Sequence, residues 1–191
     1  MMRRFLNDNL AAVARRCAMW RRWVNDRSGV AAIEFALVFP VAVGLYMGAA
    51  ETSQVLTLSR KITNITAATS DLVAQEKTID DDKIGEIFNA ATSMIVPFAE
   101  APISIVVTSI VSDASTGATT VAWSDARNGA ARAPGQSFAL PEGLIAKGES
   151  VIYTEVSYQY DSVIGHFITS GFTLNDEFYT KPRRTLQIVR E

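Results

Sequence analysis

The stretch RSGVAAIEFALVFPVAVGLYMGAAE, residues Arg27–Glu51, has the composition of a membrane span with one charge inside it. That charge is Glu34, and it is the only one in the 21 residues of Val30–Ala50. A helix of this length would cover about 31 Å, the thickness of a bilayer core. Its apolar residues lie all round the helix, as a lipid-embedded or filament-core segment requires. We therefore predict a transmembrane helix over residues 30–50.

Glu34 needs an explanation, because a carboxylate inside hydrocarbon costs about 2.5–3.5 kcal/mol or more. One alternative is a secretory signal with MGAA, before Glu51, as its cleavage site. Another is a simple single-pass anchor. The run is long for a signal, and neither alternative accounts for Glu34. Pro40 also lies inside the run, removes one backbone donor, and predicts a helix kink near residues 36–40.

Charge is distributed unevenly on the two sides of the run. Residues 1–29 hold seven arginines and two aspartates, a net charge of +5, whereas residues 30–191 hold 11 Lys/Arg and 18 Asp/Glu, a net charge of −7. By the positive-inside rule the basic head stays in the cytoplasm and the residues after Glu51 are exported. The same separation argues against a nucleic-acid partner, which needs a basic surface on the folded domain.

The sequence offers little for catalysis. Cys17 is the one cysteine and His166 the one histidine, so an internal disulfide is impossible and a His/Cys zinc site is not expected. No G-x-S-x-G elbow or Walker loop is present. His166 has no identifiable catalytic partner. We expect no metal, no cofactor and no enzymatic activity.

The segment G-VAAIEFALVFPV resembles the processing site of Tad (Flp-type) pilus proteins, in particular the TadE/TadF-like minor pilins, or pseudopilins. In type IV pilin-like precursors a basic leader ends in glycine, and a membrane-embedded aspartic prepilin peptidase cuts after it. The fifth mature residue is glutamate, and in the Tad branch the sixth is aromatic. Here Gly29 would end the leader and Val30 would begin the mature chain. Glu34 and Phe35 are then the fifth and sixth residues, and Pro40 also matches.

The resemblance implies a role for the buried acid. Cleavage would give Val30 an α-amino group, normally charged at neutral pH. In pilin-like assemblies the fifth-position carboxylate, here Glu34, is thought to pair with such an amine on a neighbouring subunit. An ion pair in a low-dielectric setting offsets part of the burial cost of each charge. Alternatively, Glu34 lies close enough to the interface to remain hydrated.

The predicted leader, residues 1–29, is long for such a precursor. Its arginines surround Trp20 and Trp23, an amphipathic basic pattern that suits the inner membrane surface. Alternatively, translation starts at Met19.

After the membrane, periodicity predicts a small α/β domain. The first helix continues over residues 30–76, and its apolar stripe is Val55, Leu58, Ile62, Ile65, Ala68, Leu72 and Val73. A second helix begins at Asp80–Asp82 and ends at Pro97, with apolar positions Ile84, Ile87, Phe88, Ala91 and Ile95. Strands are expected in ISIVVTSIVSD, TTVAWSDA, GESVIYTEVSYQYDSV and around TLNDEFYTKPRRTLQIV, with a short helical piece near residues 141–145. The fold class is α+β and pilin-like: a long helix packed on a small antiparallel sheet, with a second helix.

Three parts follow: a basic cytoplasmic leader, 1–29; a long helix, 30–76; and an exported α/β domain, 77–191. The predicted protein is an inner-membrane, single-pass minor pilin that acts in Tad pilus assembly, and hence in adhesion or secretion. Its partners would be the prepilin peptidase, other Tad subunits, the assembly platform and lipid. The alternative is an unprocessed membrane-anchored envelope protein whose exported domain binds or transforms a ligand. We expect Arg183 and Arg184 to pair with carboxylates, and Trp123 with Tyr153, Tyr158 and Tyr160 to pack within the sheet.

Overall fold

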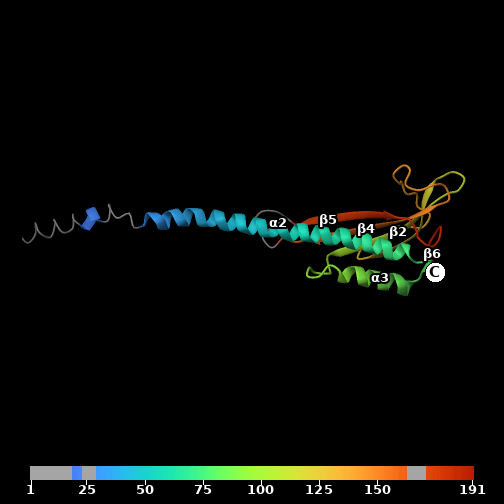
Figure 1. The fold of residues 1–191 in the computed structure, drawn as a ribbon, viewed down its shortest axis with the longest axis horizontal. Helices are drawn as coiled ribbons and strands as arrows, with labels where there is room; N and C mark the ends of the chain where they lie inside the picture. The colour runs from blue at the N-terminus through green and yellow to red at the C-terminus, as the bar shows by residue number, and fades with distance from the viewer. Residues whose placement is uncertain (1–18, 23–28, 163–170) are drawn as a thin grey trace, which may run out of the picture. The chain divides into compact units, whose positions relative to one another are not determined.

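The structure is a computed structural model that describes residues 19–22, 29–162 and 171–191 (Figure 1). Cys17, Trp23 and His166 lie outside the described residues. Residues 19–22 are helical, and the Trp20 side chain is exposed. The chain forms two compact units, residues 1–48 and 49–191.

The long helix α2 covers Val30–Ala74, so it ends two residues before the predicted boundary. Its C-terminal half buries a face of apolar and small polar residues: Leu58, Ile62, Ile65, Thr66, Thr69, Ser70, Val73 and Ala74. The predicted stripe is confirmed at Leu58, Ile62, Ile65 and Val73. It is wrong at Leu72, which is 39% exposed.

Threonines, and not Leu72, complete the buried face of α2. The Thr66 and Thr69 hydroxyls donate to the carbonyls of Ile62 and Ile65, four residues earlier, at 2.8 and 2.7 Å. This back-bonding satisfies each hydroxyl inside the helix, so the threonine can be buried like an apolar residue. A search of the sequence for apolar periodicity does not identify such positions as buried.

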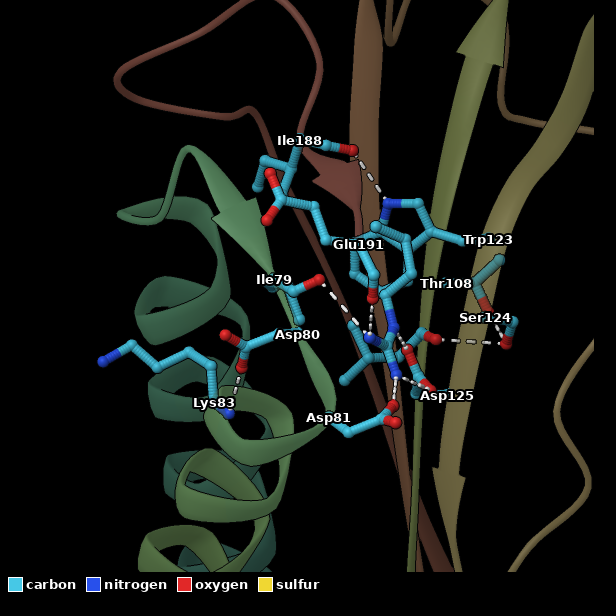
Figure 2. A network of polar contacts seen from close by, with 12 residues as sticks. Ile79, Asp80, Asp81, Lys83, Thr108, Trp123, Ser124, Asp125, Ile188 and Glu191 are labelled. Carbon is cyan, nitrogen blue, oxygen red and sulfur yellow. Dashed lines mark hydrogen bonds and ion pairs between the residues drawn. The ribbon is translucent and has the colours of Figure 1, made fainter.

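The second helix, α3, covers Asp81–Ser93. Asp80 is its N-cap, as predicted: its Oδ1 accepts from the Lys83 backbone N–H at 2.7 Å (Figure 2). The predicted apolar face is buried, but the predicted end at Pro97 is wrong. The backbone N–H groups of Met94 and Ile95 bond three residues back, at 3.2 and 3.1 Å, and these tighter turns end the helix. Pro97 also disfavours helical backbone at the residue before it.

Four strands form an antiparallel sheet in the order β3-β2-β4-β5. Their bounds are Ile103–Ser112 for β2, Thr119–Arg127 for β3, Ser150–Tyr160 for β4 and Phe172–Thr180 for β5. All four coincide with predicted strands. The short helix expected at residues 141–145 is absent from the described structure, which has turns there. Gly143 has φ of +79°, a left-handed conformation that interrupts a right-handed helix.

A second, two-stranded sheet was not predicted. In it β1, Thr78–Ile79, pairs in parallel with β6, Val189–Arg190. The pairing brings the last residues of the chain back to the segment that follows α2. The Arg183 backbone N–H also donates to the Ala74 carbonyl at 2.9 Å. The end of the long helix is therefore held by the C-terminal segment.

The four-stranded sheet buries side chains on both faces. Alternate residues of β4, among them Ile152, Val156 and Tyr158, join the core formed with α2 and α3. On the other face Val151 and Tyr153 pack with Ile110 beneath apolar side chains of the loop after β3. The predicted sheet packing of Trp123 and the three tyrosines is confirmed, because all four are at most 6% exposed. The α+β class is confirmed: a long helix, a small antiparallel sheet and a second helix.

Candidate functional site

The candidate processing motif lies at the beginning of α2. The Gly29 carbonyl accepts a hydrogen bond from the Ile33 backbone N–H at 3.1 Å, so Gly29 is the residue just before the helix. Val30 is the first helical residue. The Gly29–Val30 peptide bond therefore lies at the boundary between a turn and the helix. A cut there would leave the whole helix in the mature chain.

Glycine at position 29 has no role in the described fold. A Cβ built on Gly29 would meet nothing within 4 Å, and its φ is not in the left-handed region. Glycine is needed in a structure where a side chain would clash or where φ is positive. Neither condition holds at position 29.

Glu34 lies one turn after Val30, on the same side of the helix. Its side chain is exposed, and within the described residues it has no hydrogen bond or ion pair. The next predicted site residue, Phe35, packs against Phe39 with ring centroids 5.2 Å apart and planes inclined by 31°. The first turns of α2 thus present an acid beside an aromatic pair. Nothing in the described part of the chain neutralises that acid.

The same helix has the length and composition of a membrane span. None of its most apolar 18-residue window is buried. Bulky apolar side chains are exposed along it, including Leu37 at 71%, Leu45 at 72% and Tyr46 at 76%. Pro40 lies inside α2, where the predicted kink stays a prediction. So large an exposed apolar surface is unusual for a soluble monomer and indicates a lipid or protein environment.

A polar network holds the C-terminal segment to the domain (Figure 2). The Arg190 guanidinium donates to Asp125 at 2.8 Å and also pairs with Asp81. It donates as well to the Ile79 carbonyl at 3.4 Å and to the Glu191 carbonyl at 2.8 Å. The hydrogen bonds to Asp125 and Asp81 raise the pKa of Arg190, which stays charged. Close by, the Trp123 Nε1–H donates to the Ile188 carbonyl at 2.8 Å.

The two late arginines have different surroundings. Arg183 forms an ion pair with Asp71, near the end of α2, which confirms the expected pairing with a carboxylate. Arg184 is exposed and has no such partner among the described residues. Arg183 therefore contributes to the same attachment of the C-terminal segment to α2.

A hollow of about 510 Å³ lies on the sheet face opposite α2 and α3. Glu155 and Glu177 line it and face each other across β4 and β5. Arg132 pairs with Glu155 at 2.5 Å, and the Tyr153 hydroxyl lies 3.0 Å from Glu155 and 2.6 Å from Glu177. Burial, followed by these hydrogen bonds, raises the pKa of Tyr153. The tyrosine stays protonated, and with Arg132 it offsets the repulsion between two facing carboxylates.

Neither polar cluster was found from the sequence. Asp81, Asp125 and Arg190 are far apart in the chain, and the sequence indicates Asp81 only as part of the helix start at Asp80–Asp82. The strand predicted in GESVIYTEVSYQYDSV has side chains on alternate faces, so Tyr153 and Glu155 share one face, and this is the signal in the sequence for the second cluster. It gave no indication of Arg132, which lies in the loop after β3.

Comparison with known proteins links the chain to one family. Residues 29–70 match the model of the TadE-like protein family. No curated protein and no solved structure matches the chain. The matched segment begins at Gly29, contains all four residues of the candidate processing motif, and runs along α2 to Ser70. Through residues 29–70, the chain is therefore similar to TadE-like proteins.

Proposed function

We propose that this protein is a minor pilin-like subunit of a Tad pilus, processed by a prepilin peptidase after Gly29. The TadE-like match associates it with the Tad pilus system and with a membrane anchor. In this proposal the basic head is cytoplasmic, the domain after α2 is exported, and other Tad subunits and the assembly platform are its partners. The protein acts by packing its helix against other helices, without catalysis.

The observation that carries the proposal is the position of Gly29. It stands at the start of α2, where a side chain would meet nothing and the backbone conformation suits any residue. A glycine without a role in the fold is explained if a peptidase must bind the chain closely at this point. The basic head before it and the acid four residues after Val30 have the spacing of that substrate.

Processing also gives Glu34 a partner. The new α-amino group at Val30 would stand at the positive end of the α2 dipole. A carboxylate from a neighbouring helix could pair with it, and the Val30 amine of another subunit could pair with Glu34. In the unprocessed chain Val30 has no amine, and Glu34 has no charged partner among the described residues. Cleavage would therefore make the helix competent to assemble.

Amino-terminal sequencing of the protein from membranes with and without the prepilin peptidase tests the proposal. The mature chain should begin at Val30 only when the peptidase is present. Gly29→Leu should leave the precursor at full size. Gly44→Leu is the matched control, because a Cβ at Gly44 also meets nothing within 4 Å and the residue lies inside the span.

Two results would overturn the proposal. The first is a mature chain that begins elsewhere, for example after the small residues near Ala50. The second is Gly29→Leu protein that is shortened as efficiently as the Gly44→Leu protein. A chain that is never shortened, and whose exported domain works outside the pilus, would be the membrane-anchored envelope protein instead.

A further inference from the structure

The two edge strands of the four-stranded sheet, β3 and β5, have different surroundings. The Val121 backbone N–H of β3 donates to the Gln136 carbonyl at 2.9 Å, so the segment after β3 runs back along its first half. Further along β3, Asp125 is bound by the Arg190 guanidinium of the C-terminal segment. Other parts of the chain therefore contact the β3 edge over both of its halves.

The strand β5 forms the other edge of the sheet (Figure 1). Within the described residues, the backbone of Phe172–Thr180 bonds only to β4. An edge strand directs every second set of backbone N–H and C=O groups away from the sheet, and such edges are commonly protected by proline, lysine or a β-bulge. In β5 there is no proline, lysine or arginine, and its register against β4 is unbroken. The fold therefore leaves one regular edge with backbone groups that can accept a further strand.

One acid stands among apolar side chains on this edge. Asp176 lies between Leu174 and Phe178 on the face of β5 that continues the main core, because its partner across β4 is the core residue Val156. The Phe178 side chain is 42% exposed at this edge. Asp176 is partly buried, yet its carboxylate has no hydrogen bond or ion pair among the described residues. The neighbouring Glu177, on the opposite face, is bonded to the Tyr153 hydroxyl.

We propose that β5 pairs with an extended segment of a partner protein that places a lysine or arginine opposite Asp176 and apolar side chains on either side of it. Backbone hydrogen bonds would supply affinity, and the cation would select the partner, because a neutral or acidic strand would bury Asp176 without a countercharge. A second copy of β5 fits poorly, since two such strands would bring the Asp176 and Glu177 carboxylates of both copies together. The inference concerns the unit of residues 49–191 and does not depend on processing or pilus assembly.

Peptide binding to the full, unprocessed chain in detergent tests the proposal. The probe is Val-Thr-Val-Thr-Arg-Thr-Val-Thr-Val, which is as long as β5 and reads the same in both directions. Its valines and arginine share one face of a strand. The control peptide has glutamate in place of the arginine. Hydrogen–deuterium exchange should show that the arginine peptide protects the β5 amides, and fluorescence anisotropy should show that the glutamate peptide binds at least about fivefold more weakly.

Asp176→Asn should weaken binding of the arginine peptide about two- to fivefold, whereas Asp82→Asn, which alters an exposed acid of α3, should leave binding unchanged. The proposal fails if the arginine peptide does not protect β5, or if it binds the Asp176→Asn protein as tightly as wild type. It also fails if Asp176→Asn tightens the binding of both peptides, because Asp176 would then protect the edge from pairing. Protection of β5 that rises with protein concentration in the absence of peptide would assign the edge to a second copy and would equally overturn it.

Discussion

At the scale of single residues, the Arg190 side chain links the C-terminal strand to two other elements of the domain. Its guanidinium joins β6 to Asp125 on β3 and to Asp81 at the start of α3. The Arg190 and Asp125 side chains are 21% and 23% exposed, so the pair is largely shielded from solvent. Such a charge-assisted hydrogen bond contributes more to stability than an exposed one.

We expect Arg190→Ala to lower the free energy of unfolding by about 1–3 kcal/mol, because it leaves Asp125 without its partner. Arg184→Ala is the control, since Arg184 is exposed and unpaired among the described residues; its effect should stay within about 0.5 kcal/mol. Urea unfolding of the full chain in detergent, followed by circular dichroism, measures both. Equal effects of the two substitutions would show that the network in Figure 2 contributes nothing specific.

Asp113 gives a pH-dependent prediction at the same scale. Its Oδ1 accepts from the Ser115 hydroxyl at 2.5 Å and from the Thr116 backbone N–H at 2.7 Å in the turn between β2 and β3. The hydrogen bond from the Ser115 side chain, followed by those from Thr116, lowers the pKa of Asp113 well below its usual 3.8. A depressed pKa adds stability that is fully present above the unfolded value and is lost as pH falls below it.

Asp113→Ala should therefore lower the melting temperature near neutral pH by an amount that shrinks once the pH falls below 3.8. Asp113→Asn keeps a side-chain oxygen acceptor but cannot titrate, so its difference from wild type should also diminish at acid pH. Thermal melts across a pH series measure this. A wild-type advantage that grows on acidification would contradict the assignment.

At the scale of elements, the C-terminal half of α2 packs through a face that apolar periodicity describes only in part. Ile65 is fully buried, whereas Leu72, which the sequence placed on the same face, is 39% exposed. Ile65→Ala should lower the free energy of unfolding by about 2–5 kcal/mol, because it removes buried methyl groups and leaves a cavity. Leu72→Ala, the control, should cost less than about 1 kcal/mol. Chemical denaturation of the two variants measures the difference, and similar losses would mean that the helix faces the sheet differently.

At a second position on α2, Ser70, we predict that a substitution increases stability. The Ser70 hydroxyl is fully buried and has no hydrogen-bond partner among the described residues. Ser70→Ala removes an unpaired polar group and raises helix propensity, so it should stabilise the domain by about 0.5–2 kcal/mol. Thr66→Ala is the matched control, because the Thr66 hydroxyl is bonded to the Ile62 carbonyl. Thermal melts of the variants compare them; a destabilised Ser70→Ala would show that the hydroxyl has a partner, such as an ordered water.

Periodicity predicts the helices and strands that are long enough for their pattern of apolar residues to repeat. The helix α2, the start of α3 and the four long strands follow from spacing, from the Asp80 cap and from β-branched residues. The β1–β6 pair could not be predicted, because two-residue strands have no period and Thr78 meets Val189 only in the folded chain. The motif at Gly29 and Glu34 is local, so the sequence alone suggests it, and its processing stays a prediction. The networks around Arg190 and Tyr153 are tertiary and were not.

At the scale of the whole molecule, the proposed function predicts that the charge of Glu34 affects assembly and not the fold. Glu34→Gln should keep the chain in the membrane and leave the domain folded, because no described residue bonds to Glu34. It should reduce recovery of the protein in sheared filaments at least about tenfold, since a lost ion pair worth 1.4 kcal/mol or more changes an equilibrium by that factor. Glu86→Gln, which alters a carboxylate that is 74% exposed on α3, is the control. Immunoblots of sheared and membrane fractions compare the variants, and unchanged recovery of Glu34→Gln would rule out the pairing.

The return of the C-terminal segment to the end of α2 also bears on when the domain can fold. Ile188 belongs to the main core, and Val189 and Arg190 supply the strand that pairs with Thr78 and Ile79. A nascent chain would therefore have an open core until residues 188–190 had been synthesised. Termination before codon 188 would leave an incompletely folded polypeptide, a substrate for quality-control proteases.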